Sequence, residues 1–144
     1  MEMPLKMKLK VYSDGASRGN PGPSAIAFMI LTEDGKILKR HSKYVGVRTN
    51  NQAEYEALIS ALGYASKLSS REVVCYMDSE LVVKHLNRDY QVRNLKLKTL
   101  WLKVHELEQR FQKISFNYVP RTDSYIQKVD WLANQTLDRV RESK

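Results

Sequence analysis

Residues 9–23 have the sequence LKVYSDGASRGNPGP, in which an alternating segment runs into a dense turn. Leu9 and Val11 alternate with polar residues up to Asp14, a pattern that predicts a β-strand ending in an acid. The segment from Ser17 to Pro23 is rich in glycine and proline and predicts a tight turn. A strand followed by such a turn favours an antiparallel partner, so we expect the chain to open on paired strands.

The residues after this turn continue the antiparallel pattern. Residues 25–31 form a short apolar run, and residues 36–45 are suited to a returning strand after the turn pair Asp34-Gly35. Turn pairs of this type commonly join two neighbouring antiparallel strands. We therefore expect three antiparallel strands at the start of the chain.

A helix and a fourth strand are predicted next. The segment TNNQ fits a capping box, with Thr49 as the cap and Gln52 reaching back to it. Small and apolar residues continue at helical spacing: Ala53, Ala57, Leu58, Ala61, Leu62 and Ala65. Residues 72–78 predict a strand that closes on an acid, and Ser79 can cap the short helix after it.

The last third of the chain predicts helix, strand and helix. The first of these helices is expected to carry Leu97, Leu100, Trp101, Val104, Leu107 and Phe111. Residues 114–118 alternate as a strand that ends at Pro120. The final helix has the clearest apolar face, formed by Val129, Leu132, Ala133, Thr136, Leu137 and Val140. The order β-β-β-α-β-α-α-β-α predicts an α/β fold with a mixed sheet covered by helices, in one domain over residues 1–144.

The composition limits the classes of protein. With 144 residues, 42% of them hydrophobic, the chain can bury a core without disulfides or a structural metal. Cys75 is the only cysteine, so no intramolecular disulfide or cysteine-rich zinc site can form. No apolar run approaches the roughly 20 residues of a membrane span. Residues 1–10 are Lys-rich without the apolar stretch of a secretory signal, so we expect a reducing, cytoplasmic location.

Four acids stand out by their positions. Asp14 and Asp78 each close an apolar strand, and two adjacent parallel strands would bring both carboxylates to one edge of the sheet. Glu54 is expected in the first turn of its helix, and Asp130 near the beginning of the last helix. Each position also has a structural explanation, because aspartates commonly open turns and acids favour the first helical turn.

Acids gathered at one edge repel one another unless a cation neutralises them, and hard divalent cations prefer oxygen ligands. The net charge of +8 favours polyanionic partners, nucleic acid above all. Together these features indicate metal-assisted phosphoryl chemistry, in which two ions about 3.5–4 Å apart activate a water and stabilise the leaving oxygen. The pattern alone leaves open whether the four acids meet.

Four segments together resemble the type I ribonuclease H family, in the archaeal and bacterial form without a basic protrusion. They are SDGASRGNPGP (13–23), TNNQAEYEAL (49–58), DSELVVKHLN (78–87) and VPRTDSYIQKVDWLAN (119–134). The resemblance extends from about Leu9 to Leu137. It implies a ribonuclease H-like fold, with a five-stranded mixed sheet of three antiparallel strands and then two parallel ones, flanked by helices.

The resemblance also implies an activity. The family's catalytic and metal-binding quartet falls on Asp14, Glu54, Asp78 and Asp130. These carboxylates would bind two Mg²⁺ ions, with Mn²⁺ able to substitute. The enzyme would then cleave the RNA strand of an RNA–DNA hybrid and leave 5′-phosphate and 3′-hydroxyl ends. Arg121 resembles a catalytic arginine that some members use where others place a mobile histidine, and this chain has no histidine in that segment.

Substrate contacts can be carried over in the same way. The positions that meet the minor groove and the RNA 2′-hydroxyls fall on or beside Ser17, Asn20, Asn50 and Gln52. Those hydroxyls are the means of distinguishing RNA from DNA. Thr49 and Asn94 match positions that hold a phosphate of the DNA strand. For Asn50 a role at the start of the helix is the structural alternative, and both roles can coexist.

The chain departs from the family pattern at several points. Around Asp130 the family usually reads Ala-Asp, whereas this chain has Val129-Asp130. Glu80 stands where many relatives have Gln, which adds a negative charge beside Asp78. The segment from Thr122 to Lys128 is expected to form a loop longer than in close relatives. The connection from Arg88 to Asn94 is too short for the extra basic helix that some relatives carry.

Two alternative functions come from other classes. One is another nuclease or strand-transfer enzyme on the same fold, although such relatives generally lack the TNNQAEYEAL segment. The other is a catalytically silent nucleic-acid-binding module, which would gain little from clustered carboxylates facing phosphates. The expected partner is an RNA–DNA hybrid; no membrane and no dedicated protein partner is implied, and we expect a monomer.

Overall fold

The computed structural model describes residues 7–143, in the expected order of strands and helices. The strands are β1 (Lys8–Ser17), β2 (Gly22–Thr32), β3 (Ile37–Arg48), β4 (Glu72–Met77) and β5 (Lys113–Tyr118). The helices are α1 (Asn50–Leu68), α2 (Glu80–Leu86), α3 (Leu95–Glu108) and α4 (Ser124–Glu142). None of these helices is both long enough and apolar enough to cross a membrane. The prediction about a leader in residues 1–10 falls largely outside the described residues.

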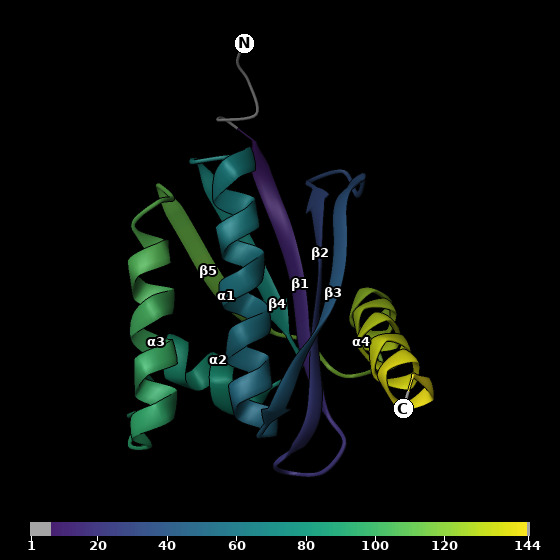
Figure 1. The fold of residues 1–144 in the computed structure, drawn as a ribbon. Helices are drawn as coiled ribbons and strands as arrows, with labels where there is room; N and C mark the ends of the chain where they lie inside the picture. Colours follow the sequence, from purple (N-terminus) through teal and green to yellow (C-terminus); the bar gives the residue numbers. More distant parts are fainter. Residues whose placement is uncertain (1–6, 144) are drawn as a thin grey trace.

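The strands form one mixed sheet in the order β3-β2-β1-β4-β5. β1, β2 and β3 pair antiparallel, whereas β4 pairs parallel to β1 and β5 parallel to β4. Figure 1 shows α1 and α3 on one side of this sheet and α4 on the other. The predicted α/β fold, with three antiparallel strands followed by two parallel ones, is confirmed.

Hydrophobic cores lie on both faces of the sheet. Leu9 and Val11 of β1 belong to the core under α1, which Leu58 enters from that helix. Tyr12 points to the opposite face, where Val129 of α4 packs. Because side chains alternate along a strand and both faces are covered, β2 is buried at nearly every position. The sheet is therefore held in place from two sides.

The predicted capping box at Thr49 and the predicted cap at Ser79 set where α1 and α2 begin. The Thr49 hydroxyl accepts a hydrogen bond from the Gln52 backbone N–H at 3.2 Å, and the Gln52 side chain accepts one from the Thr49 N–H at 2.9 Å. The Ser79 hydroxyl likewise accepts from the Val82 N–H at the start of α2. These bonds satisfy backbone donors that have no partner inside the helix.

Several element ends differ from the predictions, and two of them change the assignment of a named residue. Asp14 does not end β1, because the pairing with β2 continues as far as Ser17. Phe111 does not lie on α3, which ends at Glu108, although its ring is still buried in the core under α1. In both cases a tertiary partner decides the outcome, and a local pattern does not contain it.

The predicted long loop before Asp130 is also wrong. α4 begins at Ser124, so most of the segment from Thr122 to Lys128 is helical. The Asp123 carboxylate caps this helix by accepting hydrogen bonds from the backbone N–H groups of Tyr125 and Ile126, at 2.9 and 3.0 Å. Because an aspartate cap stabilises a helix start as strongly as serine does, the segment is helical from Ser124.

Gly15 allows α1 to approach the central strand more closely than any other residue would. A Cβ atom at this position would lie 2.3 Å from the carbonyl carbon of Ala53 and 2.5 Å from the backbone nitrogen of Glu54. Both are main-chain atoms, so they cannot be displaced without moving the helix. The packing of α1 on β1 thus requires glycine here.

We expect Gly15→Ala to lower the free energy of unfolding by about 1–3 kcal/mol, because its methyl group overpacks the contact between β1 and α1. Gly63→Ala is the matched control, because Gly63 lies in α1 and a Cβ there meets no atom within 4 Å. It should instead stabilise the protein by about 0.5–1 kcal/mol, as expected for a helix glycine. Urea unfolding of both variants measures the difference. A Gly15→Ala protein as stable as the parent would show that α1 can retreat without cost.

Candidate active site

The register of the parallel strands brings Asp14 and Asp78 to the same edge of the sheet. The pairing of β1 with β4 ends at Tyr12 and Tyr76, two residues before each aspartate. Both side chains are largely buried: Asp14 is 4% exposed, and the Asp78 side chain is 8% exposed. This is the edge at which open α/β sheets place their ligands, as predicted from the sequence.

Glu54 of α1 is the third carboxylate of the cluster. It is the fifth residue of the helix, past its first turn, so the predicted first-turn position is wrong. The favourable interaction between a negative charge and the helix dipole fades beyond the first turn. A hydrogen bond of 3.1 Å from the Gly15 backbone N–H to Glu54 Oε1 holds the side chain instead. Oxygens of Asp14, Glu54 and Asp78 all lie within 4.8 Å of one another, close enough to hold one cation.

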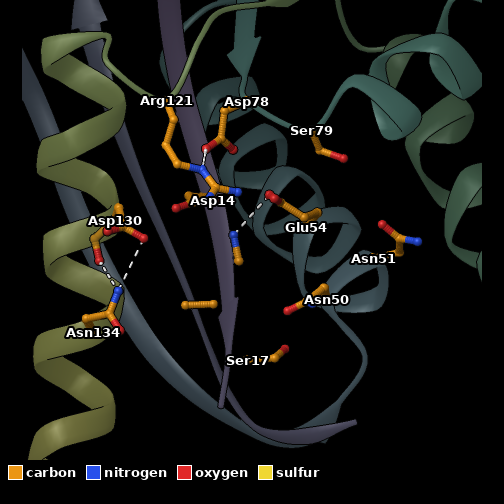
Figure 2. A pocket seen from close by; sticks show the side chains of 12 residues that line it. Asp14, Ser17, Asn50, Asn51, Glu54, Asp78, Ser79, Arg121, Asp130 and Asn134 are labelled. Atoms are coloured by element: carbon orange, nitrogen blue, oxygen red, sulfur yellow. Dashed lines mark hydrogen bonds and ion pairs between the residues drawn. The ribbon is translucent and has the colours of Figure 1, made fainter. Parts of the chain in front are cut away.

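Asp130 stands on the α4 side of this cluster. It is exposed, unlike the other three acids, and lies in the second turn of α4. Its carboxylate is close enough to Asp14 to help raise the pKa of that residue. The Asn134 amide one turn later donates to Asp130 Oδ1 at 3.2 Å and to its backbone oxygen at 3.0 Å (Figure 2). The structure therefore brings all four predicted acids to one place, three of them in a tight group.

The electrostatics of the cluster oppose ionisation. Burial raises the pKa of Asp14 well above its ordinary value, and the neighbouring carboxylates raise it further. Burial and then the charge of Asp78 raise the pKa of Glu54 to about 8, although the Gly15 N–H opposes this shift. Each extra negative charge in this space is costly. A divalent cation coordinated by these oxygens would remove that cost.

The acids lie in a cleft of about 500 Å³. Its lining residues are Asp14, Gly15, Ala16, Ser17, Asn50, Asn51, Glu54, Asp78, Ser79, Arg121, Asp130 and Asn134. Figure 2 shows these groups converging from β1, α1 and α4 and from the segments after β4 and β5. The Nε of Arg121 lies 3.5 Å from Asp78 Oδ2, while its side chain remains 90% exposed. Arg121 is therefore both close to the carboxylates and free to reorient.

A second hollow of about 750 Å³ adjoins the cleft, and Asn51 lines both. It contains four of the predicted substrate-binding residues, Asn20, Thr49, Gln52 and Asn94. The other two, Ser17 and Asn50, line the carboxylate cleft. Lys96 also lines the second hollow and adds positive charge there. The six predicted contact residues thus fall on one continuous face.

Several of these residues also support the local structure. The Asn20 side chain accepts a hydrogen bond from the Asn50 backbone N–H at 3.0 Å, which ties the turn after β1 to the start of α1. The Asn94 side chain accepts from the Leu97 N–H at 3.0 Å and caps α3. The Ser17 hydroxyl shares a hydrogen bond of 2.7 Å with Ser24. These bonds preorganise the polar groups that face the two hollows.

Known proteins match both the sequence and the fold. Residues 12–136 match the family model described as reverse transcriptase-like. Ribonuclease HI of Halobacterium salinarum is 37% identical over 131 residues, which cover 91% of this chain and 65% of that protein. A bifunctional protein of Mycobacterium tuberculosis is 36% identical over 138 residues, which cover 95% of this chain and 37% of that protein. The chain therefore spans less than two thirds of the length of these relatives.

Solved structures give the same result. The crystal structure of RNase H1 from Halobacterium salinarum has a TM-score of 0.86 at 37% identity, covering 92% of this chain and 98% of that one. LC11-RNase H1 from compost, in complex with an RNA/DNA hybrid, has a TM-score of 0.85 at 37% identity, with the same coverage. The chain belongs to the type 1 ribonuclease H family.

Within the family pattern, the departures of this chain can now be placed. Glu80 is exposed at the start of α2 and is not one of the cleft-lining residues. The histidines of the chain, His41, His85 and His105, lie in β3, α2 and α3. None of them lines the cleft, so among the cleft-lining residues the positive charge comes from Arg121.

Three residues that shape the site were not predicted from the sequence. Gly15 was noticed only as part of a motif, although its N–H fixes Glu54. Asn134 lies four residues after Asp130, a spacing that places two side chains on one helix face and could have been noticed. Arg18 contacts Asn134 across 116 residues of sequence, and no local pattern contains such a contact.

The raised carboxyl pKa values predict how pH and metal change stability. Between about pH 4, where unfolded carboxyls titrate, and about 8, the raised pKa of Glu54, the folded state holds more protons than the unfolded chain. Without divalent cations, the free energy of unfolding should therefore fall as pH rises through this window. Added Mg²⁺ should raise the melting temperature more at pH 8 than at pH 5.

Calorimetry at both pH values, with EDTA or with Mg²⁺, measures this effect. Glu54→Gln is the control, since it removes the titrating group while keeping its shape. Its melting temperature should depend less on pH and less on Mg²⁺ than that of the parent. A Mg²⁺ effect of the same size in the parent and in Glu54→Gln would place the ion elsewhere.

Proposed function

We propose that this protein is an endonuclease that hydrolyses the RNA strand of RNA–DNA hybrids and leaves 5′-phosphate and 3′-hydroxyl ends. The convergence of Asp14, Glu54 and Asp78, with Asp130 beside them, carries the proposal. The cleft lies on a chain of net charge +8, so a negatively charged site is embedded in a basic protein. That combination suits a polyanion that reacts at a metal centre. The relatives named ribonuclease HI and the hybrid-bound LC11-RNase H1 support it.

Mg²⁺ is the proposed cofactor, with two ions per site and Mn²⁺ as a possible substitute. The donors in the cleft are carboxylate oxygens, which hard divalent cations prefer. Asp14, Glu54 and Asp78 would hold one ion, and Asp14 with Asp130 would hold the second. When bound, such a pair supplies an activated water and stabilisation of the leaving ribose oxygen.

The protein groups around the carboxylates would position the RNA strand. Ser17 and Asn50 line the cleft beside the acids and can exchange hydrogen bonds with 2′-hydroxyls, the groups that DNA lacks. Arg121 can leave Asp78 and make a forked contact with a phosphate, because its side chain is exposed. Its charge is permanent across the working pH range, so it attracts phosphate and does not transfer protons.

The second hollow would hold the DNA strand. Thr49, Asn94 and Lys96 line it together, and their hydroxyl, amide and ammonium groups suit a backbone phosphate. Asn20 and Gln52 line the same hollow, and Asn20 is hydrogen-bonded to the cleft-lining Asn50. Contacts to both strands at once would favour a hybrid duplex over a single strand.

The proposal extends to the organisation of the protein. We propose a single ribonuclease H domain over residues 1–144, acting as a monomer in the cytoplasm. The buried, unpaired Cys75 is in keeping with a reducing compartment.

Cleavage assays on matched RNA–DNA hybrid, double-stranded RNA and double-stranded DNA test the substrate. Cleavage of the hybrid alone supports the proposal, and cleavage of the DNA duplex at a similar rate would contradict it.

Asp78→Asn should abolish hybrid cleavage in Mg²⁺ and leave the fold intact, because a neutral amide is a poor ligand for a hard cation. The loss of one buried negative charge should also raise the melting temperature in EDTA. Glu80→Gln is the matched control, since it removes a nearby exposed charge and should retain activity. Steady-state cleavage rates and circular dichroism of both variants decide the matter. Near-normal turnover in purified Asp78→Asn would show that the proposed metal site is wrong.

Arg121→Ala should lower turnover by about 10- to 100-fold, the cost of a lost charge-assisted hydrogen bond of about 1.5–3 kcal/mol. Metal affinity should stay nearly unchanged, because an arginine is not a ligand. Arg121→Lys should recover only part of the loss, since the charge returns without the planar fork. Single-turnover and steady-state rates on one hybrid measure the effect. Unchanged rates in the alanine variant would reduce Arg121 to an exposed residue covering the strand end.

A further inference from the structure

Asp130 differs from the other carboxylates in how it is held. Asp14 and Asp78 are buried at strand ends, and Glu54 receives a backbone hydrogen bond. Asp130 is exposed on α4, where an aspartate side chain can adopt several rotamers. A carboxylate that must complete a metal site needs a partner that fixes its orientation.

That partner is the Asn134 side chain, one helical turn further on. Its Nδ2 donates to Asp130 Oδ1 at 3.2 Å and to the Asp130 carbonyl oxygen at 3.0 Å. An asparagine amide can point either of two ways, with oxygen and nitrogen exchanged. If it were reversed, its oxygen would face the carboxylate and repel it. Asp130 itself therefore favours the orientation with nitrogen towards it, and a donor facing the amide oxygen selects the same orientation.

Arg18, in the turn between β1 and β2, supplies that selection. Its Nη2 lies 3.4 Å from Asn134 Oδ1 and 3.2 Å from the Asn134 carbonyl oxygen. The same nitrogen forms an ion pair of 2.7 Å with Asp138 Oδ1. A guanidinium can only donate hydrogen bonds, so it favours the amide oxygen as its neighbour. The amide nitrogen then faces Asp130. Asp138 in turn holds the guanidinium in place.

We propose that Arg18 and Asn134 are positioning residues that orient Asp130 for the second metal ion. Arg18 fixes the amide of Asn134, and the amide holds one carboxylate oxygen of Asp130. The other oxygen is then left for the cation that Asp130 shares with Asp14. This inference rests on the proposed metal-dependent nuclease function and adds residues outside the acidic quartet to it.

The test compares Asn134→Ala, Arg18→Ala and the double variant. Binding of Mn²⁺ to the free protein, followed by electron paramagnetic resonance, is the first measurement. The Mg²⁺ concentration that gives half-maximal hybrid cleavage is the second. Asn134→Ala should weaken the weaker Mn²⁺ site by about tenfold, the lower end for a lost partner of a metal ligand. Its turnover should recover towards that of the parent at high Mg²⁺.

Arg18→Ala should shift both measurements in the same direction by a smaller factor. Because Arg18 acts through Asn134, the double variant should be no weaker than Asn134→Ala alone, a non-additivity that a double-mutant cycle reveals. Gln127→Ala is the control for an exposed polar side chain on the same helix, and its Mn²⁺ binding should equal that of the parent.

Unchanged Mn²⁺ binding in Asn134→Ala, or additive losses in the double variant, would overturn the inference. So would a turnover defect that high Mg²⁺ does not restore, since that result indicates general damage to α4. If the parent binds Mn²⁺ but does not cleave hybrids, the proposed substrate is wrong while the Mn²⁺ measurement still decides the positioning role. A parent that binds no Mn²⁺ would overturn both.

Discussion

The close contact between β1 and α1 at Gly15 is the constraint on which the carboxylate cluster depends. The missing side chain lets the backbone of α1 reach the central strand, and the Gly15 N–H then holds Glu54 beside Asp14. β1 also pairs with β4 in parallel, which fixes Asp78 relative to Asp14. One glycine therefore connects the hydrophobic core under α1 to the geometry of three acids.

The cluster is costly, and the rest of the molecule is arranged around that cost. Burial and mutual repulsion raise the pKa values of Asp14 and Glu54, so the acids resist full ionisation while no cation is present. The chain as a whole carries a net charge of +8, which attracts a phosphate backbone over a longer range. At the cleft itself the acids would repel phosphate. Cations that neutralise the acids would remove this repulsion, so cation and polyanion binding should strengthen each other.

The sequence predicted those features that depend on local periodicity. The element order, the capping box at Thr49 and the shared edge of Asp14 and Asp78 follow from alternation, cap residues and strand pairing. The end of β1 and the packing of Phe111 were not predictable, because partners distant in sequence decide them. The early start of α4 was predictable from Asp123 and was missed. The four acids stood out by their positions, but only the resemblance grouped them into one site, since spacing alone does not show that they meet.

The site is assembled from both faces of the sheet, which explains its asymmetry. α1 brings Glu54 from one face, and α4 brings Asp130 from the other, each on its own hydrophobic core. The three buried acids depend on the core under α1 and on the strands. Asp130 depends on a separate core, so a small shift of α4 would move it without moving the others. A contact that ties α4 directly to the turn after β1, as Arg18 does through Asn134 and Asp138, counteracts this independence at the point where the two faces meet.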